Sequence, residues 1–138
     1  LYAFSVFIKP LQAQFDDVMR KTARNRNLVL TIALSYSGRK EIIRSVRLLC
    51  EDVKNGLVKR IDERTFRRHL YSPAIPDPDF LIRTSGEMRL SNFLLWQVAY
   101  TEIYVTDILW PDFRKQAFLE ALAEFAKRDR RFGNVKDF

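Results

Sequence analysis

The chain has 138 residues, enough for one domain, which at this size buries roughly 70% of the surface of its unfolded form. Hydrophobic residues make up 47% of it and charged residues 30%, with only 4 glycines and 5 prolines, which excludes a long disordered or low-complexity tract. The net charge of +7 favours an anionic partner, namely nucleic acid, an acidic membrane surface or a phosphorylated small molecule, without choosing among them.

The sequence carries few signals about location. Its longest apolar runs fall far short of the ~20 residues that cross a bilayer. The single cysteine, Cys50, cannot form an intramolecular disulfide, which favours a reducing compartment, and its apolar helical position predicts an inert core thiol. The opening L-Y-A-F-S has no initial methionine and is typical of a strand interior, so we expect the chain to begin within a larger protein.

The first third of the chain predicts a strand, a helix and a second strand. Residues 1–5 alternate loosely and predict a short strand, and apolar residues at helical spacing predict a helix over residues 11–24. The run L-V-L-T-I-A-L at residues 28–34 is continuous and apolar, which is typical of a strand buried on both faces of a parallel sheet.

Two helices are predicted after the turn S-Y-S-G-R. The first covers the apolar positions of residues 42–53 and ends at the Asn-Gly pair of residues 55–56. The second covers residues 62–69 and has Asp62 as a suitable N-cap. Two apolar side chains are expected to pack beneath it, Phe66 and Leu70.

The remaining elements are short. F-L-I-R at residues 80–83 and E-I-Y-V at residues 102–105 predict two strands. Between them a polar loop leads into a short helix predicted over residues 93–99, and Pro111 opens a last helix. Strands that alternate with helices predict an α/β fold, a largely parallel sheet flanked by helices, in a single domain over residues 1–138.

The end of the first of these strands carries candidate anion-binding residues. In open α/β sheets, ligands bind beyond the carboxyl ends of the strands. Arg83 ends the strand, and Arg89 and Ser91 follow in the loop. Two guanidinium groups, a hydroxyl and loop amides can donate many hydrogen bonds to a diphosphate. On pattern alone, a solvated loop whose arginines pair with Asp79 or Glu87 is the simpler explanation.

The next carboxylate along the chain is Glu102, at the start of the strand expected to lie alongside. A carboxylate beside a bound diphosphate suits Mg²⁺, which takes one or two carboxylates together with phosphate oxygens and waters. Taken alone, Glu102 is explained as simply by a charge on the surface of a strand.

The segment L-I-R-T-S-G-E-M-R-L-S-N-F-L-L-W-Q-V-A-Y-T-E-I-Y-V-T-D-I-L-W-P-D-F resembles the C-terminal signature of cis-prenyltransferases, the family of undecaprenyl and dehydrodolichyl diphosphate synthases. The similarity runs over residues 79–133 and includes the specific pattern R-x(5)-R-x-S with a glutamate eleven residues later. Carried over by position, the resemblance implies that Arg83, Arg89 and Ser91 bind isopentenyl diphosphate. It also implies that Glu102 is associated with Mg²⁺.

Two weaker matches lie near the ends of the chain. R-F-G near the C-terminus resembles the family's R-x-G element, which reaches the active site of the partner subunit, and this implies that Arg131 and Gly133 contact substrate. L-Y-A-F-S resembles the strand that ends near the allylic substrate, which implies pocket positions for Phe4 and Ser5. Taken alone, Arg131 is typical of a solvated basic helix end.

The sequence departs from the family at its beginning. The family segment D-G-N-x-R-W-A, whose aspartate holds Mg²⁺ and whose loop binds the allylic diphosphate, does not occur in it. A long stretch that follows L-Y-A-F-S in the family is also missing, which predicts a junction between distant pieces near residues 5–6. We therefore expect this chain alone to have little or no turnover.

The resemblance implies cis-prenyl chain elongation, in which isopentenyl diphosphate condenses with an allylic prenyl diphosphate to give a polyprenyl diphosphate of the undecaprenyl or dolichol type. It implies Mg²⁺ as cofactor and a homodimer or a heterodimer with a homologue. We expect a cytoplasmic location, and peripheral membrane contact, the endoplasmic reticulum and the plastid stay open as alternatives. The alternatives within the family are a non-catalytic partner subunit, which the retained arginines disfavour, and an inactive truncated form.

A basic nucleic-acid-binding module is the alternative from another class. Its support is the net charge and the cluster R-T-F-R-R-H. The basic residues are spread over several segments and match no nucleic-acid motif, so we expect no nucleic-acid partner. His69 is the single histidine, which excludes a zinc site built on several imidazoles and predicts a surface group at a helix end.

Overall fold

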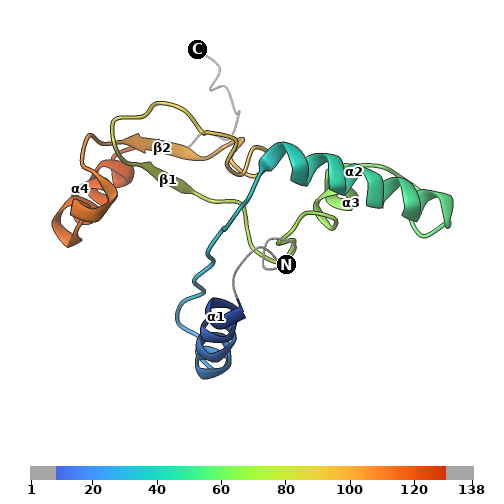
Figure 1. Ribbon diagram of the computed structural model, residues 1–138. Coiled ribbons are helices and arrows are strands. Elements are labelled where there is room, and N and C mark those ends of the chain that lie inside the picture. The colour runs from blue at the N-terminus through green and yellow to red at the C-terminus, as the bar shows by residue number, and fades with distance from the viewer. Residues whose placement is uncertain (1–8, 130–138) are drawn as a thin grey trace, which may run out of the picture. The chain divides into compact units, whose positions relative to one another are not determined.

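The computed structural model describes residues 9–129 of the chain (Figure 1). The chain divides between Ser37 and Gly38 into two compact units, of which the first contains helix α1 and the second contains the other helices and both strands. The α/β class with a parallel sheet is confirmed, whereas the single domain over residues 1–138 stays a prediction. No helix among the described residues is long and apolar enough to cross a bilayer.

Helix α1 (Lys9–Thr22) confirms the first predicted helix. On its exposed side, Asp17 forms ion pairs with Lys21 at 2.6 Å and Arg20 at 2.7 Å. Their hydrogen bonds, that of Lys21 first, hold the pKa of Asp17 below its ordinary value. Because all three side chains are exposed, these pairs contribute little to stability.

Residues 28–34 form no strand in the described structure, so the predicted buried strand was wrong for this chain. The run is exposed instead, with 80% of Leu28, 81% of Val29 and 78% of Leu30 accessible to solvent. Within residues 9–129, no backbone hydrogen bond joins residues 28–34 to another segment. A strand forms only where a neighbour pairs with its N–H and C=O groups, and composition alone cannot supply that neighbour.

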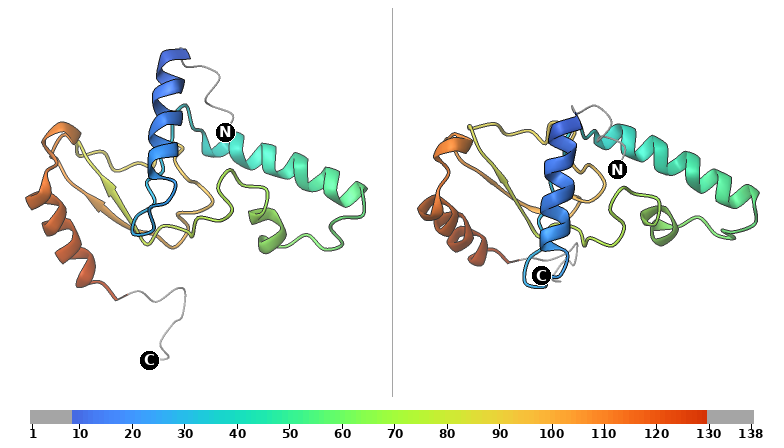
Figure 2. Two further views of the ribbon diagram at one scale, coloured as in Figure 1. Left: turned by 90° about the horizontal axis from the view of Figure 1, so that it is seen from below. Right: turned by 60° about the horizontal axis from the view of Figure 1, so that its bottom comes forward.

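Helices α2 (Gly38–Lys54) and α3 (Glu63–Arg67) confirm the next two predicted helices, and α2 is followed by the expected Asn-Gly turn, where Gly56 has a φ of 71°. The two helices lie side by side (Figure 2). The partly buried Trp96 packs against Phe66 with ring centroids 4.3 Å apart. The buried side chains of this core are Leu49, Phe66 and Leu70.

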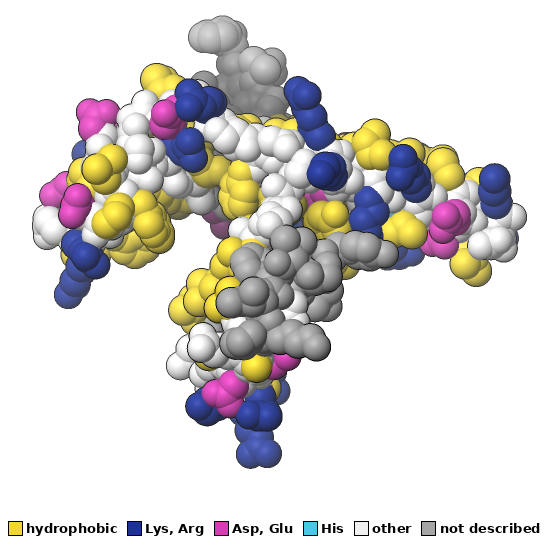
Figure 3. Space-filling model, viewed as in Figure 1, with side chains coloured by type: hydrophobic (Ala, Val, Ile, Leu, Met, Phe, Trp, Pro, Cys, Tyr) yellow, Lys and Arg dark blue, Asp and Glu magenta, His cyan; other side chains and the backbone are white. Residues whose placement is uncertain are grey.

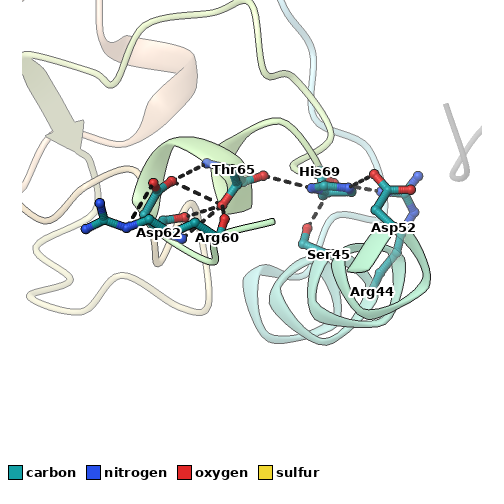
Figure 4. A network of polar contacts seen from close by, with 7 residues as sticks. All are labelled: Arg44, Ser45, Asp52, Arg60, Asp62, Thr65 and His69. Atoms are coloured by element: carbon teal, nitrogen blue, oxygen red, sulfur yellow. Dashed lines mark hydrogen bonds and ion pairs between the residues drawn. The ribbon is translucent and has the colours of Figure 1, made fainter. Parts of the chain in front are cut away.

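Asp62 caps α3 as predicted (Figure 4). Its Oδ1 accepts the backbone N–H of Thr65 at 2.9 Å, and Oγ1 of Thr65 accepts the backbone N–H of Asp62 at 2.9 Å. The backbone hydrogen bond, followed by the side-chain bond from Thr65, holds the pKa of Asp62 below its ordinary value. The stabilisation by this cap is therefore present at neutral pH and is lost as the pH falls through the lowered pKa.

His69 lies between α3 and α2 with only 11% of its side chain exposed, so the predicted surface position was wrong (Figure 4). Its Nε2 lies 2.9 Å from Oδ2 of Asp52, and its Nδ1 lies 2.9 Å from the carbonyl oxygen of Thr65. Its own carbonyl accepts the hydroxyl of Ser45 at 2.9 Å. The ring is buried because α2 offers it polar partners, a tertiary effect that sequence spacing does not reveal.

Strands β1 (Phe80–Arg83) and β2 (Glu102–Val105) form a two-stranded parallel sheet, which confirms both predicted strands and their direction. The first residues of the two strands face each other, as do the last. Helix α4 (Lys115–Ala126) packs on this sheet, with the Phe125 ring 4.7 Å from that of Phe80 and Ala121 fully buried.

Two predictions about helices in this unit were wrong. Residues 93–99 form turns, because the left-handed backbone of Asn92 (φ 65°) and Leu94 (φ 46°) is incompatible with a helix start. The proline expected to open the last helix lies in a short 3₁₀ helix, η2 (Trp110–Asp112), and α4 begins only at Lys115.

Cys50 is exposed, so the predicted core thiol was wrong. Helix α2 buries one narrow stripe, and Cys50 is turned about 100° from its last member. That stripe consists of Gly38, Glu41, Ser45 and Leu49.

Candidate functional site

The loop that follows β1 carries the candidate residues Arg89 and Ser91, and it is attached to the segment that follows β2. Ser85 donates its backbone N–H to the carbonyl of Ile108 at 3.0 Å, and Gly86 donates to Thr106 at 2.9 Å. The start of the loop after β1 is therefore fixed to the segment after β2. In α/β proteins this edge of the sheet is where ligands bind.

The loop that follows β1 contains several residues with a left-handed backbone conformation. L-residues other than Asn and Asp seldom adopt positive φ, and a bulky residue there is an outlier. Such conformations persist only where the surrounding structure enforces them, and they cluster at binding sites. The residues at positive φ between positions 84 and 95 are Ser85 (68°), Gly86 (66°), Ser91 (49°), Asn92 (65°) and Leu94 (46°).

Arg83 ends β1 with a buried Nε that has no hydrogen-bond partner among residues 9–129. A guanidinium group stays charged in proteins, so this donor cannot lose its proton to avoid the cost. Leaving a buried donor unsatisfied costs about 1–3 kcal/mol. An anion bound at this end of the sheet would remove that cost, which makes Arg83 a candidate ligand-binding residue on geometry as well as on motif.

Arg89 forms an ion pair with Glu87, with Nη1 2.5 Å from Oε2, and 69% of its side chain is exposed. This is one of the two pairs expected of a plain solvated loop. An exposed pair of this kind is worth at most about 1 kcal/mol, so a bound anion could displace Glu87 from Arg89. Within residues 9–129, no hydrogen bond or ion pair joins the side chains of Arg83, Arg89 and Ser91 to one another.

The start of helix α2 is hydrogen-bonded to Asn92, the residue that follows Ser91. Gly38 donates its N–H to the carbonyl of Asn92 at 2.8 Å, and Arg39 donates its N–H to Oδ1 of Asn92 at 2.9 Å. These N–H groups have no partner within the helix, so the loop satisfies them. A Cβ on Gly38 would lie 2.9 Å from Cγ of Leu95, and only glycine permits this close approach. Ser91 is thereby held next to the positive end of a helix dipole.

The structure does not bring Glu102 to the end of the sheet that carries Arg83. Glu102 is the first residue of β2 and Arg83 is the last residue of β1, so in a parallel pair they lie about 10 Å apart along the strands. Oε2 of Glu102 accepts a hydrogen bond from Nη1 of Arg128 at 2.9 Å, and the same nitrogen donates to the carbonyl of Ile103 at 2.9 Å. With 29% of its side chain exposed, Glu102 is a half-buried partner of an ion pair.

The described residues fit a magnesium ion only in part. They contain no group of three or more His, Cys, Asp or Glu side chains that could hold a metal ion. Glu102 offers a single carboxylate, and Arg128 already occupies one of its oxygens. Since Mg²⁺ commonly takes one carboxylate and completes its shell with phosphate oxygens and waters, Glu102 fits as one ligand where a diphosphate supplies the others.

The family model described as putative undecaprenyl diphosphate synthase matches residues 3–133. The chain belongs to this family. The resemblance to cis-prenyltransferases drawn from residues 79–133 is thereby confirmed and extends over nearly the whole chain.

Curated relatives agree with the family model. The isoprenyl transferase of Thermotoga maritima is 50% identical over 88% of this chain and 52% of its own length, and that of Bacillus subtilis is 49% identical over 87% and 47%. The tritrans,polycis-undecaprenyl-diphosphate synthase (geranylgeranyl-diphosphate specific) of Pyrococcus horikoshii is 46% identical over 91% and 48%. The chain thus spans about half the length of the curated relatives it matches.

Solved structures of the family share the fold. Lavandulyl diphosphate synthase from Lavandula x intermedia, solved with dimethylallyl diphosphate, superposes with a TM-score of 0.87 at 37% identity, over 94% of this chain and 57% of that one. A probable undecaprenyl diphosphate synthase from Campylobacter jejuni gives a TM-score of 0.77 at 33% identity, over 95% and 60%.

Some expected site residues of this cis-prenyltransferase chain lie outside the described residues and stay predictions. They are Phe4, Ser5, Arg131 and Gly133, together with the junction near residues 5–6.

Sequence reasoning missed two residues that shape the loop of this family member. Asn92 bridges the loop to α2, and its tolerance of positive φ, directly after Ser91, was the available signal. Asp107 lies so close to Gly86 that a Cβ there would be 2.7 Å from Oδ1 of Asp107. No local pattern predicts that contact, because it depends on how the segments after β1 and β2 meet.

Proposed function

We propose that this chain carries the isopentenyl-diphosphate-binding part of a cis-prenyltransferase, which condenses isopentenyl diphosphate with an allylic prenyl diphosphate to give a polyprenyl diphosphate. The observation that carries the proposal is the family match over residues 3–133. The named activities of the relatives and the dimethylallyl diphosphate bound by the Lavandula enzyme support the substrate class. The activity belongs to a full-length version, meaning a polypeptide that has the whole family fold and contains these residues as one part.

In this proposal Arg83, Arg89 and Ser91 bind the diphosphate of the isopentenyl substrate at the carboxyl end of β1. The buried, unpartnered Nε of Arg83 and the exposed, weakly paired guanidinium of Arg89 both support an anion at this end. Two guanidinium groups give the directed, bidentate contacts that hold a diphosphate in one orientation.

The reaction itself follows from charge and proximity. The bond between the allylic carbon and its diphosphate breaks, the double bond of isopentenyl diphosphate attacks that carbon, and a proton is lost to leave a cis double bond. The barrier comes mainly from charge that develops on the departing diphosphate. Fixing the acceptor's own diphosphate with Arg83 and Arg89 holds the double bond near the allylic carbon, which lowers the entropic part of the barrier.

We also propose Mg²⁺ as the cofactor, with Glu102 as a carboxylate ligand from this chain. A bound Mg²⁺ would neutralise diphosphate charge. The half-buried position of Glu102 supports this role, and Arg128 would have to share or release the carboxylate.

Replacing Glu102 by glutamine tests this role. In a full-length version we expect the Mg²⁺ concentration needed for half-saturation to rise about tenfold, because an ionised ligand contributes about 1.5 kcal/mol more than a neutral amide. Isothermal titration of Mg²⁺ in the presence of isopentenyl diphosphate measures it. Arg128→Ala is the matched control, since it frees the carboxylate and is expected to lower that concentration. Equal Mg²⁺ requirements in Glu102→Gln and the unaltered protein would contradict the assignment.

Incorporation of radiolabelled isopentenyl units into an allylic primer tests the proposed function. We expect turnover in a full-length version and little or none in the 138-residue chain alone. A full-length version that binds an active homologue but incorporates no label would instead be a non-catalytic partner subunit. Failure to bind isopentenyl diphosphate at all would refute the proposal.

Gly86 and Gly56 offer a matched pair for testing the loop. Both have a left-handed backbone, with φ of 66° and 71°. A Cβ added at Gly86 would lie 2.7 Å from Oδ1 of Asp107, whereas a Cβ added at Gly56 would have no neighbour within 4 Å. We expect Gly86→Ala and Gly56→Ala each to lower the free energy of unfolding by about 1–2 kcal/mol, the cost of left-handed backbone in an L-residue. Only Gly86→Ala should also weaken isopentenyl diphosphate binding, measured by titration of full-length versions. Equal binding in the two variants would show that the loop is not the site.

We further propose that the full-length version dimerises, with itself or with a homologue, and that Arg131 and Gly133 approach the partner's active site. A cytoplasmic location is supported by the single, unpaired cysteine. Basic side chains project along α2 and would favour peripheral contact with an acidic membrane (Figure 3).

A further inference from the structure

The ring of His69 meets a hydrogen-bond acceptor at each of its two nitrogens (Figure 4). Nε2 lies 2.9 Å from Oδ2 of Asp52 in the last turn of α2, and Nδ1 lies 2.9 Å from the carbonyl oxygen of Thr65 in α3. Neither a carbonyl oxygen nor an ionised carboxylate has a hydrogen to donate. A neutral imidazole has one N–H group and one lone pair, so it can donate to only one of these two acceptors.

Both contacts are hydrogen bonds only when both ring nitrogens carry a proton. In the neutral ring, a lone pair would face one of the two oxygens at 2.9 Å, in a side chain that is only 11% exposed. An acceptor that loses its donor where water has little access destabilises the fold. In the doubly protonated ring, Nε2 donates to the carboxylate of Asp52, and a charge-assisted bond of this kind is stronger than a neutral one.

The charged groups around His69 favour the doubly protonated ring. The charged side chains that bond to His69 within residues 9–129 are Asp52 and Arg44, both from α2. Asp52 contacts the ring, whereas Arg44 donates Nη1 to the backbone carbonyl of His69 at 3.1 Å and lies over the ring of Tyr71. From α3 the ring meets the uncharged carbonyl of Thr65. The charge that contacts the ring nitrogens is therefore negative.

We propose that His69 is a pH-sensitive clasp between α2 and α3, meaning a side chain that joins the two helices through both ring nitrogens and loses one of these bonds with its second proton. The clasp lies where α2 gives way to the connection that leads to α3. The carbonyl of Asp52 accepts the backbone N–H groups of Leu57 and Val58 at 2.9 and 3.3 Å, so the ring fixes this connection as well as α3. The proposal concerns the helix pair and is independent of the proposed function.

The direction of the pH dependence follows from which state of the chain favours the second proton. Because the folded chain gives that proton an acceptor, the stabilisation by the clasp is present at low pH and is lost as the pH rises through the range in which histidine titrates. The cap formed by Asp62 weakens in the opposite direction, as the pH falls through its lowered pKa. The pairing of α3 with α2 is therefore strongest between these two limits.

The protonation of the ring can be measured directly, because His69 is the single histidine of the chain. NMR spectra that correlate the ring nitrogens with the carbon-bound ring hydrogens distinguish a ring with two N–H groups from a ring with one. We expect both nitrogens to stay protonated to a higher pH in the folded 138-residue chain than in the same chain unfolded in urea. Loss of the second proton at the same pH in both states, or at a lower pH in the folded chain, would overturn the proposal.

Urea denaturation from about pH 5 to about pH 8 tests the effect on stability. Relative to His69→Gln, the unfolding equilibrium constant of the unaltered chain should rise about tenfold over this range, since a hydrogen bond to a charged group is lost. Asp52→Asn should remove most of this rise. Glu51→Gln, which neutralises an exposed carboxylate on the same helix, should keep it. The same pH dependence in the unaltered chain and in His69→Gln, or a rise that survives Asp52→Asn in full, would contradict the clasp.

Discussion

Replacing Arg83 by methionine in a full-length version is expected to weaken isopentenyl diphosphate binding by about 100-fold while leaving the free energy of unfolding unchanged or higher. A bidentate contact between a guanidinium group and a phosphate contributes about 3 kcal/mol, and each 1.4 kcal/mol corresponds to tenfold in affinity. The free energy of unfolding should not fall. In the ligand-free protein the buried Nε of Arg83 is an unsatisfied donor that destabilises the fold. Methionine removes this donor and keeps most of the side-chain volume. Calorimetric titration and urea denaturation measure the two quantities.

Companion variants separate this explanation from a loss of structure. Arg89→Ala should strongly raise the concentration of isopentenyl diphosphate needed for half-maximal activity. It should not affect the fold, because the exposed Arg89 side chain loses only its ion pair with Glu87. Arg47→Ala removes an exposed arginine of α2 and should change neither binding nor stability. Unchanged steady-state kinetics in Arg89→Ala would refute its role. A large stability loss in Arg83→Met would show that Arg83 serves the fold rather than a ligand.

Glu41→Ala is expected to lower the free energy of unfolding by about 3 kcal/mol. Glu41 lies on α2 with 1% of its surface exposed, and its Oε1 accepts the backbone N–H of Tyr71 at 2.8 Å. Its Oε2 accepts Nε2 of Gln97 at 3.1 Å. Removing the carboxylate takes a charged acceptor from two part-buried donors, each worth about 1–3 kcal/mol. Urea denaturation of the 138-residue chain measures the change.

Glu51 is the matched control for Glu41, because it lies on the same helix but is exposed. Glu51→Ala should change the free energy of unfolding by no more than about 0.5 kcal/mol, as surface substitutions usually do. If Glu41→Ala cost as little as Glu51→Ala, the carboxylate would not tie α2 to the segments around Tyr71 and Gln97.

The elements that the sequence predicted correctly are those with local causes. The Asn-Gly pair ends α2, and Asp62 caps α3, because turn and cap chemistry act within a few residues. The strand predicted over residues 28–34 was wrong for the opposite reason. A strand needs a neighbouring strand to pair with, and the local sequence does not determine whether one is present. The helix predicted over residues 93–99 was wrong because Asn92 and Leu94 adopt a left-handed backbone conformation, which the apolar pattern does not reveal.

The candidate site divides in the same way. The motif located Arg83 at the carboxyl end of β1 correctly, because strand ends follow from the apolar run that precedes them. The distance between Arg83 and Glu102 could have been anticipated, since the last residue of one parallel strand and the first of the next lie at opposite ends. The pairing of Glu102 with Arg128 could not, because it depends on where α4 ends over the sheet.

Residues 84–101, which hold Arg89 and Ser91 of the candidate site, are also the connection that lets β1 and β2 run parallel. The two strands can pair only when this stretch closes, and that closure costs conformational entropy. An anion that settles the stretch into its bound shape would therefore favour the folded chain as well as occupy it. The diphosphate that we propose to bind here would then also stabilise the folded chain.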